Sequence, residues 1–188
     1  MRAVVVYESM FGNTHAIADA IGRGIGEGLE PVDNVVVVPV VEAGRLVVGG
    51  PTHFHGMSST HTRKWAASIT KKPKNDLVLD RDAQGPGVGD WLRSLGDGRP
   101  KVAAFDTRFK GPAVLRGRAS RAISRKLRSR GFEVVAKPES FFVTLQNHLE
   151  PGEEARAQEW GKRLAARVLL NDVTNGDGPR RPPTSKED

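Results

Sequence analysis

Short runs of β-branched residues alternate with helical stripes along this chain of 188 residues. The first run, Ala3–Tyr7, is apolar throughout, which is typical of a strand buried on both faces of a sheet. It leads through a short loop into a stretch with Ile17, Ile21 and Ile25 on one helical side. Strands that alternate with helices predict an α/β fold, in which a parallel sheet is covered by helices on both faces.

The same alternation continues to about residue 170. We expect further strands at Val35–Val41, Leu46–Gly50, Val102–Phe105 and Phe132–Ala136, the last continued by Ser140–Val143. We expect further helices at Thr62–Thr70, Trp91–Leu95 and Arg118–Arg130, and a last one from Pro151. The length fits a single domain over residues 1–170. Residues 171–188 are polar and rich in glycine and proline, so we expect a disordered tail there.

The composition excludes several classes of site. The chain has no cysteine, which excludes disulfides, thiolate catalysis and cysteine-ligated zinc or iron–sulfur centres. No apolar run approaches the roughly 18 residues of a membrane-spanning helix, and no secretory signal is apparent, so we expect a cytoplasmic protein. The net charge of +7 is local, because residues 99–137 hold twelve Lys or Arg against two acidic residues. A polyanion, an acidic partner or solubility could explain this excess.

The loop between the first strand and the first helix has the chemistry of an anion site. Amides at a helix start and the helix dipole both favour a negative group, and two hydroxyls can donate. The loop has neither the dinucleotide fingerprint nor the nucleoside-triphosphate motif, so it predicts a phosphomonoester held by neutral donors. Alternatively, Asn13 or Thr14 simply caps the helix. The loop consists of Ser9, Met10, Phe11, Gly12, Asn13 and Thr14.

The strand–SMFGNT–helix pattern, followed by GGPTHFHGMSS after a later strand, resembles the flavodoxin superfamily, whose members bind FMN. The pair of loops is most similar to flavoproteins of the NAD(P)H:quinone oxidoreductase type. The motifs align from Met1 to Gly56, and the order of elements extends the likeness to about Leu169. The resemblance implies a flavodoxin-like three-layer sandwich around a mostly parallel five-stranded sheet of order 2-1-3-4-5. It also implies FMN-dependent electron transfer or NAD(P)H-dependent quinone reduction.

By the same resemblance, two further loops meet the flavin ring. Phe54 would cover the ring and Gly56 would give access to the backbone, while either histidine could bond the ring or relay a proton. The two histidines lack a clear third ligand, so we expect no metal. The sequence identifies no catalytic residue. The second loop consists of Pro51, Thr52, His53, Phe54, His55 and Gly56, and the third contains Asp106, Thr107, Arg108 and Phe109.

One connection conflicts with this family pattern. Between the expected second strand and Arg45 only Glu42, Ala43 and Gly44 remain. A parallel crossover ordinarily needs a dozen or more residues. We therefore expect the second crossover helix to be missing or rebuilt. Either Val35–Val38 is not a full edge strand, or the chain has lost a segment around Ala43–Gly44.

A second reading is a flavodoxin-fold binding module without flavin, which would use the basic 108–130 region to contact an acidic partner or nucleic acid. Arg118, Arg121, Arg125 and Arg128 recur at helical spacing on one face. No aromatic residues are interleaved for base stacking, so we rank nucleic acid below a redox partner or an NAD(P)H and quinone substrate pair. The sequence leaves a homo-oligomer open.

Overall fold

The computed structural model describes residues 2–26, 29–33, 43–52, 56–70, 77–80, 83, 85–97, 101–111 and 117–175. The strands are β1 (Arg2–Tyr7), β2 (Leu29–Asp33), β3 (Ala43–Pro51), β4 (Lys101–Phe109), β5 (Glu133–Val134) and β6 (Glu139–Val143). The helices are α1 (Asn13–Ile25), α2 (Thr60–Ile69), α3 (Val88–Ser94), α5 (Ala119–Arg128) and α6 (Glu153–Asn175).

The strands form one parallel sheet in the order β2-β1-β3-β4-β5. The sixth strand, β6, is also parallel to β4. Strands β5 and β6 pair with successive parts of β4, so together they fill one edge position, interrupted around Pro138. The expected α/β fold with five strand positions and the flavodoxin-type order is therefore confirmed.

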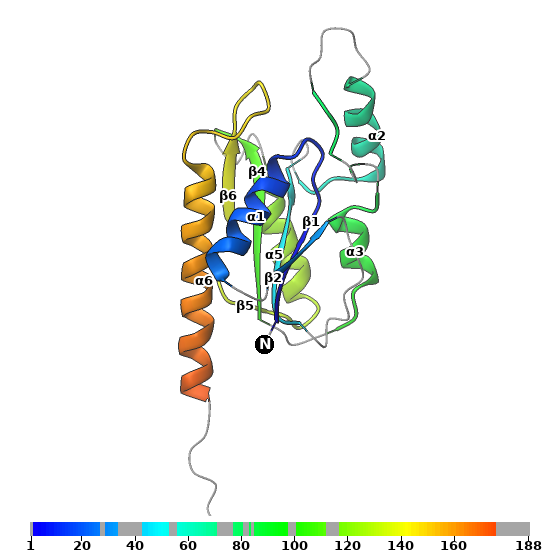
Figure 1. Cartoon of the computed structure of the whole chain (residues 1–188). Helices are drawn as coiled ribbons and strands as arrows, with labels where there is room; N and C mark the ends of the chain where they lie inside the picture. Colours follow the sequence, from blue (N-terminus) through cyan, green and yellow to red (C-terminus); the bar gives the residue numbers. More distant parts are fainter. Residues whose placement is uncertain are drawn as a thin grey trace, which may run out of the picture.

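Helices cover both faces of the sheet (Figure 1). On one face, α1 and α6 pack over an apolar cluster that includes Ile17, Ile21, Phe105, Phe141 and Trp160. On the other face, α3 and α5 pack over a second cluster that includes Val48, Trp91, Leu92, Ile123 and Leu127. Both clusters take alternate residues of β1, as expected for a strand buried on both sides.

Helix α2 covers neither face of the sheet. It lies beyond the carboxyl ends of the strands, where its Ala66 packs with Met10 and Ala83 (Figure 1). Phe11 and Leu79 are partly buried against this small cluster. The cluster therefore fixes the loop after β1 from outside the sheet.

The position of the second strand differs from the prediction. Strand β2, at Leu29–Asp33, pairs with β1, whereas the predicted strand Val35–Val41 lies outside the described residues. The sequence favours Val35–Val41 because six of its seven residues are valine, whereas Leu29–Asp33 has only one β-branched residue. The proline in β2 is tolerated at a sheet edge because its missing N–H can face solvent. The connection from β2 to β3 is now residues 34–42 rather than three residues. These nine residues can span about 30 Å when extended, which removes the conflict over reach. The predicted loss or rebuilding of the second crossover helix concerns residues 34–42, which lie outside the described residues.

The last helix extends beyond the predicted domain boundary. Helix α6 continues to Asn175, past residue 170, so residues 171–175 continue the helix. No glycine or proline interrupts the sequence there before Gly176. The remaining residues of the predicted tail, 176–188, lie outside the description. None of the described helices is both long and apolar enough to cross a membrane.

Candidate functional site at the carboxyl edge of the sheet

The loop after β1 turns sharply into α1 through a glycine. Gly12 is the N-cap of α1 and has a left-handed φ of 85°, which glycine adopts without steric cost. Its amide donates to the buried hydroxyl of Ser9 at 3.1 Å. Neither Asn13 nor Thr14 caps the helix, because α1 has no side-chain cap. The alternative that the loop is only a helix cap therefore loses its support.

The start of α1 keeps donors available. The backbone amides of Asn13 and Thr14 have no acceptor within the helix, as first-turn amides never do, and none among the other described residues. No acidic side chain lies in the first turn to offset the positive end of the helix dipole. An ideal Cβ on Gly12 would meet nothing within 4 Å, so no described side chain packs against this point of the loop. This geometry favours an anion at the helix start.

A buried hydroxyl pair lies beside this helix start. The Thr14 and Thr107 hydroxyl oxygens are 2.7 Å apart, and the two residues are only 2% and 4% exposed. One proton lies between the two oxygens, so the other hydroxyl must direct its proton elsewhere. No acceptor for it occurs among the described residues. The pair therefore presents one further donor in a buried position.

The third predicted loop belongs largely to a strand. Strand β4 continues to Phe109, so the four candidate residues from Asp106 to Phe109 alternate between the faces of the sheet. Thr107 points toward α1, whereas Asp106 points toward α5. The sequence predicts that this strand ends at Phe105, because polar residues follow the apolar run there and obscure the strand's continuation.

Asp106 anchors the start of α5. Its fully buried carboxylate accepts from the Ser120 amide at 2.8 Å and from the Thr52 hydroxyl at 3.1 Å. The same Thr52 oxygen accepts from the Ala119 amide at 3.0 Å. The second carboxylate oxygen of Asp106 is buried and has no partner in the described part of the chain. The carboxyl ends of β3 and β4 thus hold the start of α5 in place.

Arg108 and Phe109 complete β4 with different roles. The buried Arg108 guanidinium donates to the carbonyls of Phe109 and Gly111 at 3.2 and 3.0 Å. It also lies over the Phe142 ring, 4.9 Å from the centroid. Arg108 therefore holds the turn that follows the strand, while Phe109 remains 37% exposed at the carboxyl edge.

Only part of the second predicted loop is described. Pro51 ends β3, and the Thr52 amide donates to the Thr107 carbonyl at 2.8 Å, which extends the pairing of β3 and β4. Gly56 is half-buried, and an ideal Cβ on it would meet nothing within 4 Å. His53, Phe54 and His55 lie outside the described residues. Within the described residues no group of three potential metal ligands occurs.

Sequence reasoning missed the role of Glu8, which directly precedes the first loop. This buried carboxylate accepts from the Val88 amide at 3.0 Å and so ties the start of α3 to the end of β1. Its other oxygen is buried without a partner among the described residues. A lone acidic residue after a buried strand gave no sequence signal for this contact.

A buried arginine connects α2 with α3. Arg63 pairs with Asp90 at 2.7 Å and donates to the Ser58 hydroxyl at 3.1 Å. Asp90 also accepts from the Gly87 amide at 3.0 Å. The Gly87 hydrogen bond, opposed by partial burial and reinforced by Arg63, lowers the pKa of the Asp90 carboxyl below its ordinary value of 3.8. Ser58 lies two residues after Gly56, where the second loop ends. The network therefore holds the chain in place just beyond that loop.

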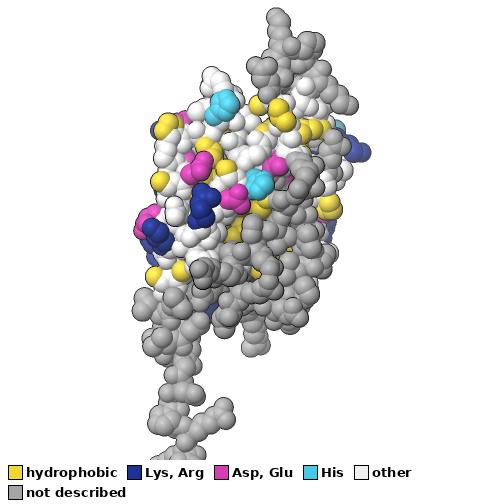
Figure 2. Space-filling view, viewed as in Figure 1, with side chains coloured by type: hydrophobic (Ala, Val, Ile, Leu, Met, Phe, Trp, Pro, Cys, Tyr) yellow, Lys and Arg dark blue, Asp and Glu magenta, His cyan; other side chains and the backbone are white. Residues whose placement is uncertain are grey.

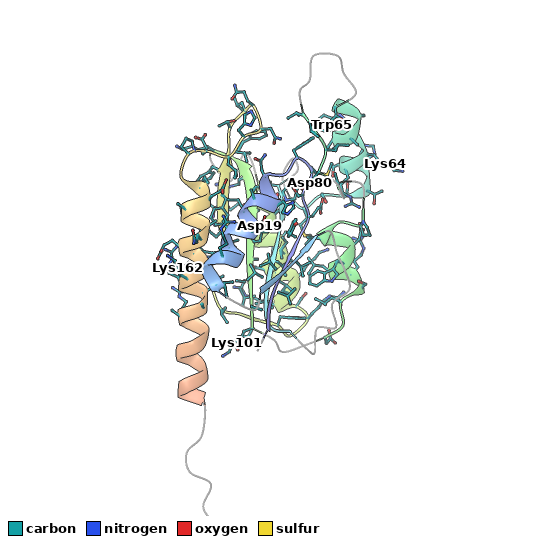
Figure 3. The ribbon with its side chains drawn as sticks, in the orientation of Figure 1. Asp19, Lys64, Trp65, Asp80, Lys101 and Lys162 are labelled. Atoms are coloured by element: carbon teal, nitrogen blue, oxygen red, sulfur yellow. The ribbon has the colours of Figure 1, made fainter. Side chains whose placement is uncertain are left out.

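His15 links α1 to Asp80, which contacts the loop after β1. Its ring stacks on Tyr7 with centroids 5.0 Å apart. Its two nitrogens lie 3.6 Å from carboxylate oxygens of Asp19 and Asp80, which Figure 3 labels. The Asp80 amide donates to the Met10 carbonyl at 2.8 Å. These contacts join the loop after β1 to α1 and to Asp80.

The loop after β6 also reaches the site. The Asn13 side chain donates to the Asn147 carbonyl at 2.8 Å, which joins the helix start to this loop. Asn147 has a φ of 62°, a left-handed value that asparagine tolerates better than most residues. An asparagine in a polar segment predicts a turn at this place. It does not predict that the turn contacts Asn13.

Comparison with solved structures identifies the fold as flavodoxin-like. An archaeal flavodoxin is 22% identical, with a TM-score of 0.58 over 90% of this chain and 99% of its own. Flavodoxin 1 from Bacillus cereus is 19% identical, with a TM-score of 0.58 over 90% and 98% of the two chains. A flavodoxin, WrbA-like protein from Agrobacterium tumefaciens is 20% identical, with a TM-score of 0.56 over 90% and 98%.

No protein-family model matches the chain, and no curated protein matches it in sequence. At about one residue in five identical, the structural likeness shows the fold alone. The expected flavodoxin-like fold is thus confirmed, whereas the resemblance to the quinone-reductase type remains a prediction.

Proposed function

We propose that this chain is an FMN-binding redox protein. The observation that carries the proposal is the start of α1, where a helix without a side-chain cap presents its first amides beside the buried Thr14–Thr107 hydroxyl pair. These groups are neutral donors, and together they suit the phosphate of a flavin mononucleotide. The flavodoxins among the structural neighbours support the same assignment.

The residues described at the site fit this group. The amides of Asn13 and Thr14, with one hydroxyl of the threonine pair, would hold the phosphate. Phe109, exposed at the end of β4, would offer apolar contact to the ring. The ring would also meet the second loop, in which the resemblance implies that Phe54 covers the ring. When bound, FMN would supply one- and two-electron transfer.

Comparison of three flavins tests the proposal. The purified chain should bind FMN more tightly than riboflavin, because only FMN carries the phosphate that the helix start would hold. It should also bind FMN more tightly than FAD, since the sequence has neither the dinucleotide fingerprint nor the nucleoside-triphosphate motif that could hold a second phosphate. Titration of flavin fluorescence gives the three affinities. Equal affinity for FMN and riboflavin would overturn the phosphate assignment.

A second experiment separates an electron carrier from an NAD(P)H:quinone reductase. A reductase must accept a hydride from NAD(P)H and pass electrons to a quinone, whereas a carrier exchanges electrons with a protein. We infer reductase activity from the resemblance of the two loops. Sustained NAD(P)H oxidation by the FMN-loaded chain with a soluble quinone would support it. A rate equal to that of free FMN would leave the carrier as the function.

A further inference from the structure

The outer face of α5 carries a row of arginines. Arg121, Arg125 and Arg128 are exposed and follow one another at spacings of four and three residues, so they share one side of the helix. The opposite side is buried through Ile123 and Leu127. None of the three guanidinium groups has a hydrogen bond or an ion pair within the described part of the chain. Residues 119–128 include no acidic side chain.

The other helical face of the molecule is arranged differently. On α6, Lys162 lies 3.7 Å from Glu159, and Arg23 of α1 lies 3.7 Å from Glu154. Figure 2 shows basic and acidic side chains next to one another on this face. Over α1 and α6 the exposed Arg23, Lys162 and Arg163 are therefore paired with acidic side chains. Only Arg167 among the exposed cations of these two helices has no such pair in the described part of the chain, whereas the three arginines of α5 all lack one.

Helix electrostatics explains only part of the arginine row. Arg125 and Arg128 lie in the last turn of α5, where the negative end of the helix dipole favours a cation. Arg121 lies in the first turn, where the same dipole disfavours a cation, and that turn has no acidic residue. Its spacing of four residues from Arg125 adds repulsion between like charges. Arg121 thus carries a cost to the helix without a compensating contact among the described residues.

The arginine row begins next to the candidate site. The first amides of α5, those of Ala119 and Ser120, bond to Thr52 and Asp106 at the carboxyl ends of β3 and β4. Arg121 is the next residue along the helix. From Arg121 to Arg128 the row runs about 10 Å away from this edge, at 1.5 Å per residue. A partner bound along the row would therefore lie against the rim of the site.

We propose that this face of α5 is the docking surface for an acidic protein that exchanges electrons with the site. The role of that partner in electron transfer rests on the proposed FMN function, whereas the docking itself does not. Charge complementarity selects an acidic surface, because three unpaired arginines offer forked donors for carboxylates. Nucleic acid fits less well, because α5 has no aromatic residue for base stacking and its short row reaches few phosphates.

Binding to an acidic protein tests the proposal without any flavin. The full chain is titrated with a plant-type iron–sulfur ferredoxin, whose surface is acidic, at low and at high salt. We expect binding that weakens as salt rises. The variant R121E/R125E should weaken it about tenfold or more, because like charges then face each other. The matched control R23E/K162E changes the net charge by the same amount on the other face, and its affinity should change by less than about twofold.

Folding and the alternative partner are controlled in the same experiment. The single variant Arg121→Glu should unfold at the same or a higher temperature than the wild type, because a carboxylate suits the first turn. Weaker binding by this variant would then be a surface effect and would support the proposal. Equal losses in R121E/R125E and R23E/K162E, or no loss in either, would overturn it. Tighter binding to a mixed-sequence single-stranded oligonucleotide than to ferredoxin would also overturn it. A failed FMN titration would leave these outcomes unchanged, so the two proposals fail separately.

Discussion

The hydroxyl oxygens of Thr14 and Thr107 lie 2.7 Å apart, although 93 residues separate them in the sequence. This contact joins the first turn of α1 to the carboxyl end of β4. It therefore sets the spacing between two walls of the candidate phosphate site. Both residues are buried, so the bond is made away from competing water.

Removing either hydroxyl of this pair should weaken FMN binding. In Thr14→Val or Thr107→Val the remaining hydroxyl loses its partner, and the free energy of unfolding should fall by about 1 kcal/mol. FMN affinity should fall by about 2 kcal/mol, since a hydrogen bond to a charged group is lost. Chemical denaturation and flavin titration measure the two effects. Riboflavin is the matched control ligand, and an equal loss of riboflavin affinity would mean that the hydroxyls do not serve the phosphate.

Thr52→Val should loosen the start of α5. The hydroxyl of Thr52 both donates to Asp106 and accepts from the Ala119 amide, so the variant leaves two buried polar groups without that partner. We expect a loss of about 1–3 kcal/mol in the free energy of unfolding and faster hydrogen exchange at the Ser120 amide. Ser129→Ala removes an exposed hydroxyl at the other end of α5 and should cost less than about 0.5 kcal/mol. Equal costs for the two variants would contradict the anchoring role.

Two glycines of α1 should respond in opposite directions to alanine. A Cβ at Gly24 would lie 2.0 Å from the Gln158 carbonyl oxygen, so α1 and α6 approach too closely there for a side chain. Gly24→Ala should therefore lower the free energy of unfolding by about 1–3 kcal/mol. Gly22 has open space, and Gly22→Ala should raise it by up to about 1 kcal/mol through helix propensity. Urea denaturation of both variants measures this, and a destabilised Gly22→Ala would contradict the packing.

The Asp90 carboxylate should make stability fall in acid. Its pKa is lowered in the folded chain by the Gly87 amide, with Arg63 adding to the effect. A lowered folded pKa contributes stability above the ordinary value of 3.8, and this contribution is lost as the pH falls through the folded pKa. Asp90→Asn should flatten that part of the stability profile, measured by denaturation between neutral pH and acid. The exposed Asp97 provides a control, and an equal flattening by Asp97→Asn would count against the network.

Prediction from sequence succeeded where the signal was local. The strand, loop and helix over residues 3–25 follow from an apolar run, small polar residues and a helical stripe, all within one stretch of chain. Prediction failed for β2, because its segment has a single β-branched residue and lies next to a stronger β-branched run. Whether a segment becomes an edge strand depends on its pairing with β1, which no local pattern records.

The amino-acid sequence alone was enough to predict an α/β protein with a loop suited to an anion between β1 and α1. It did not determine what the polar residues after Phe105 do. The tertiary structure extends β4 through them, turns Thr107 toward Thr14 and turns Asp106 toward Ser120. Alternation along a strand is a local property, whereas the faces that the alternating side chains meet depend on the parallel pairing of β4 with β3 and on the helices packed over both sides. Those partners lie far away in sequence, so only the folded chain brings the site residues together.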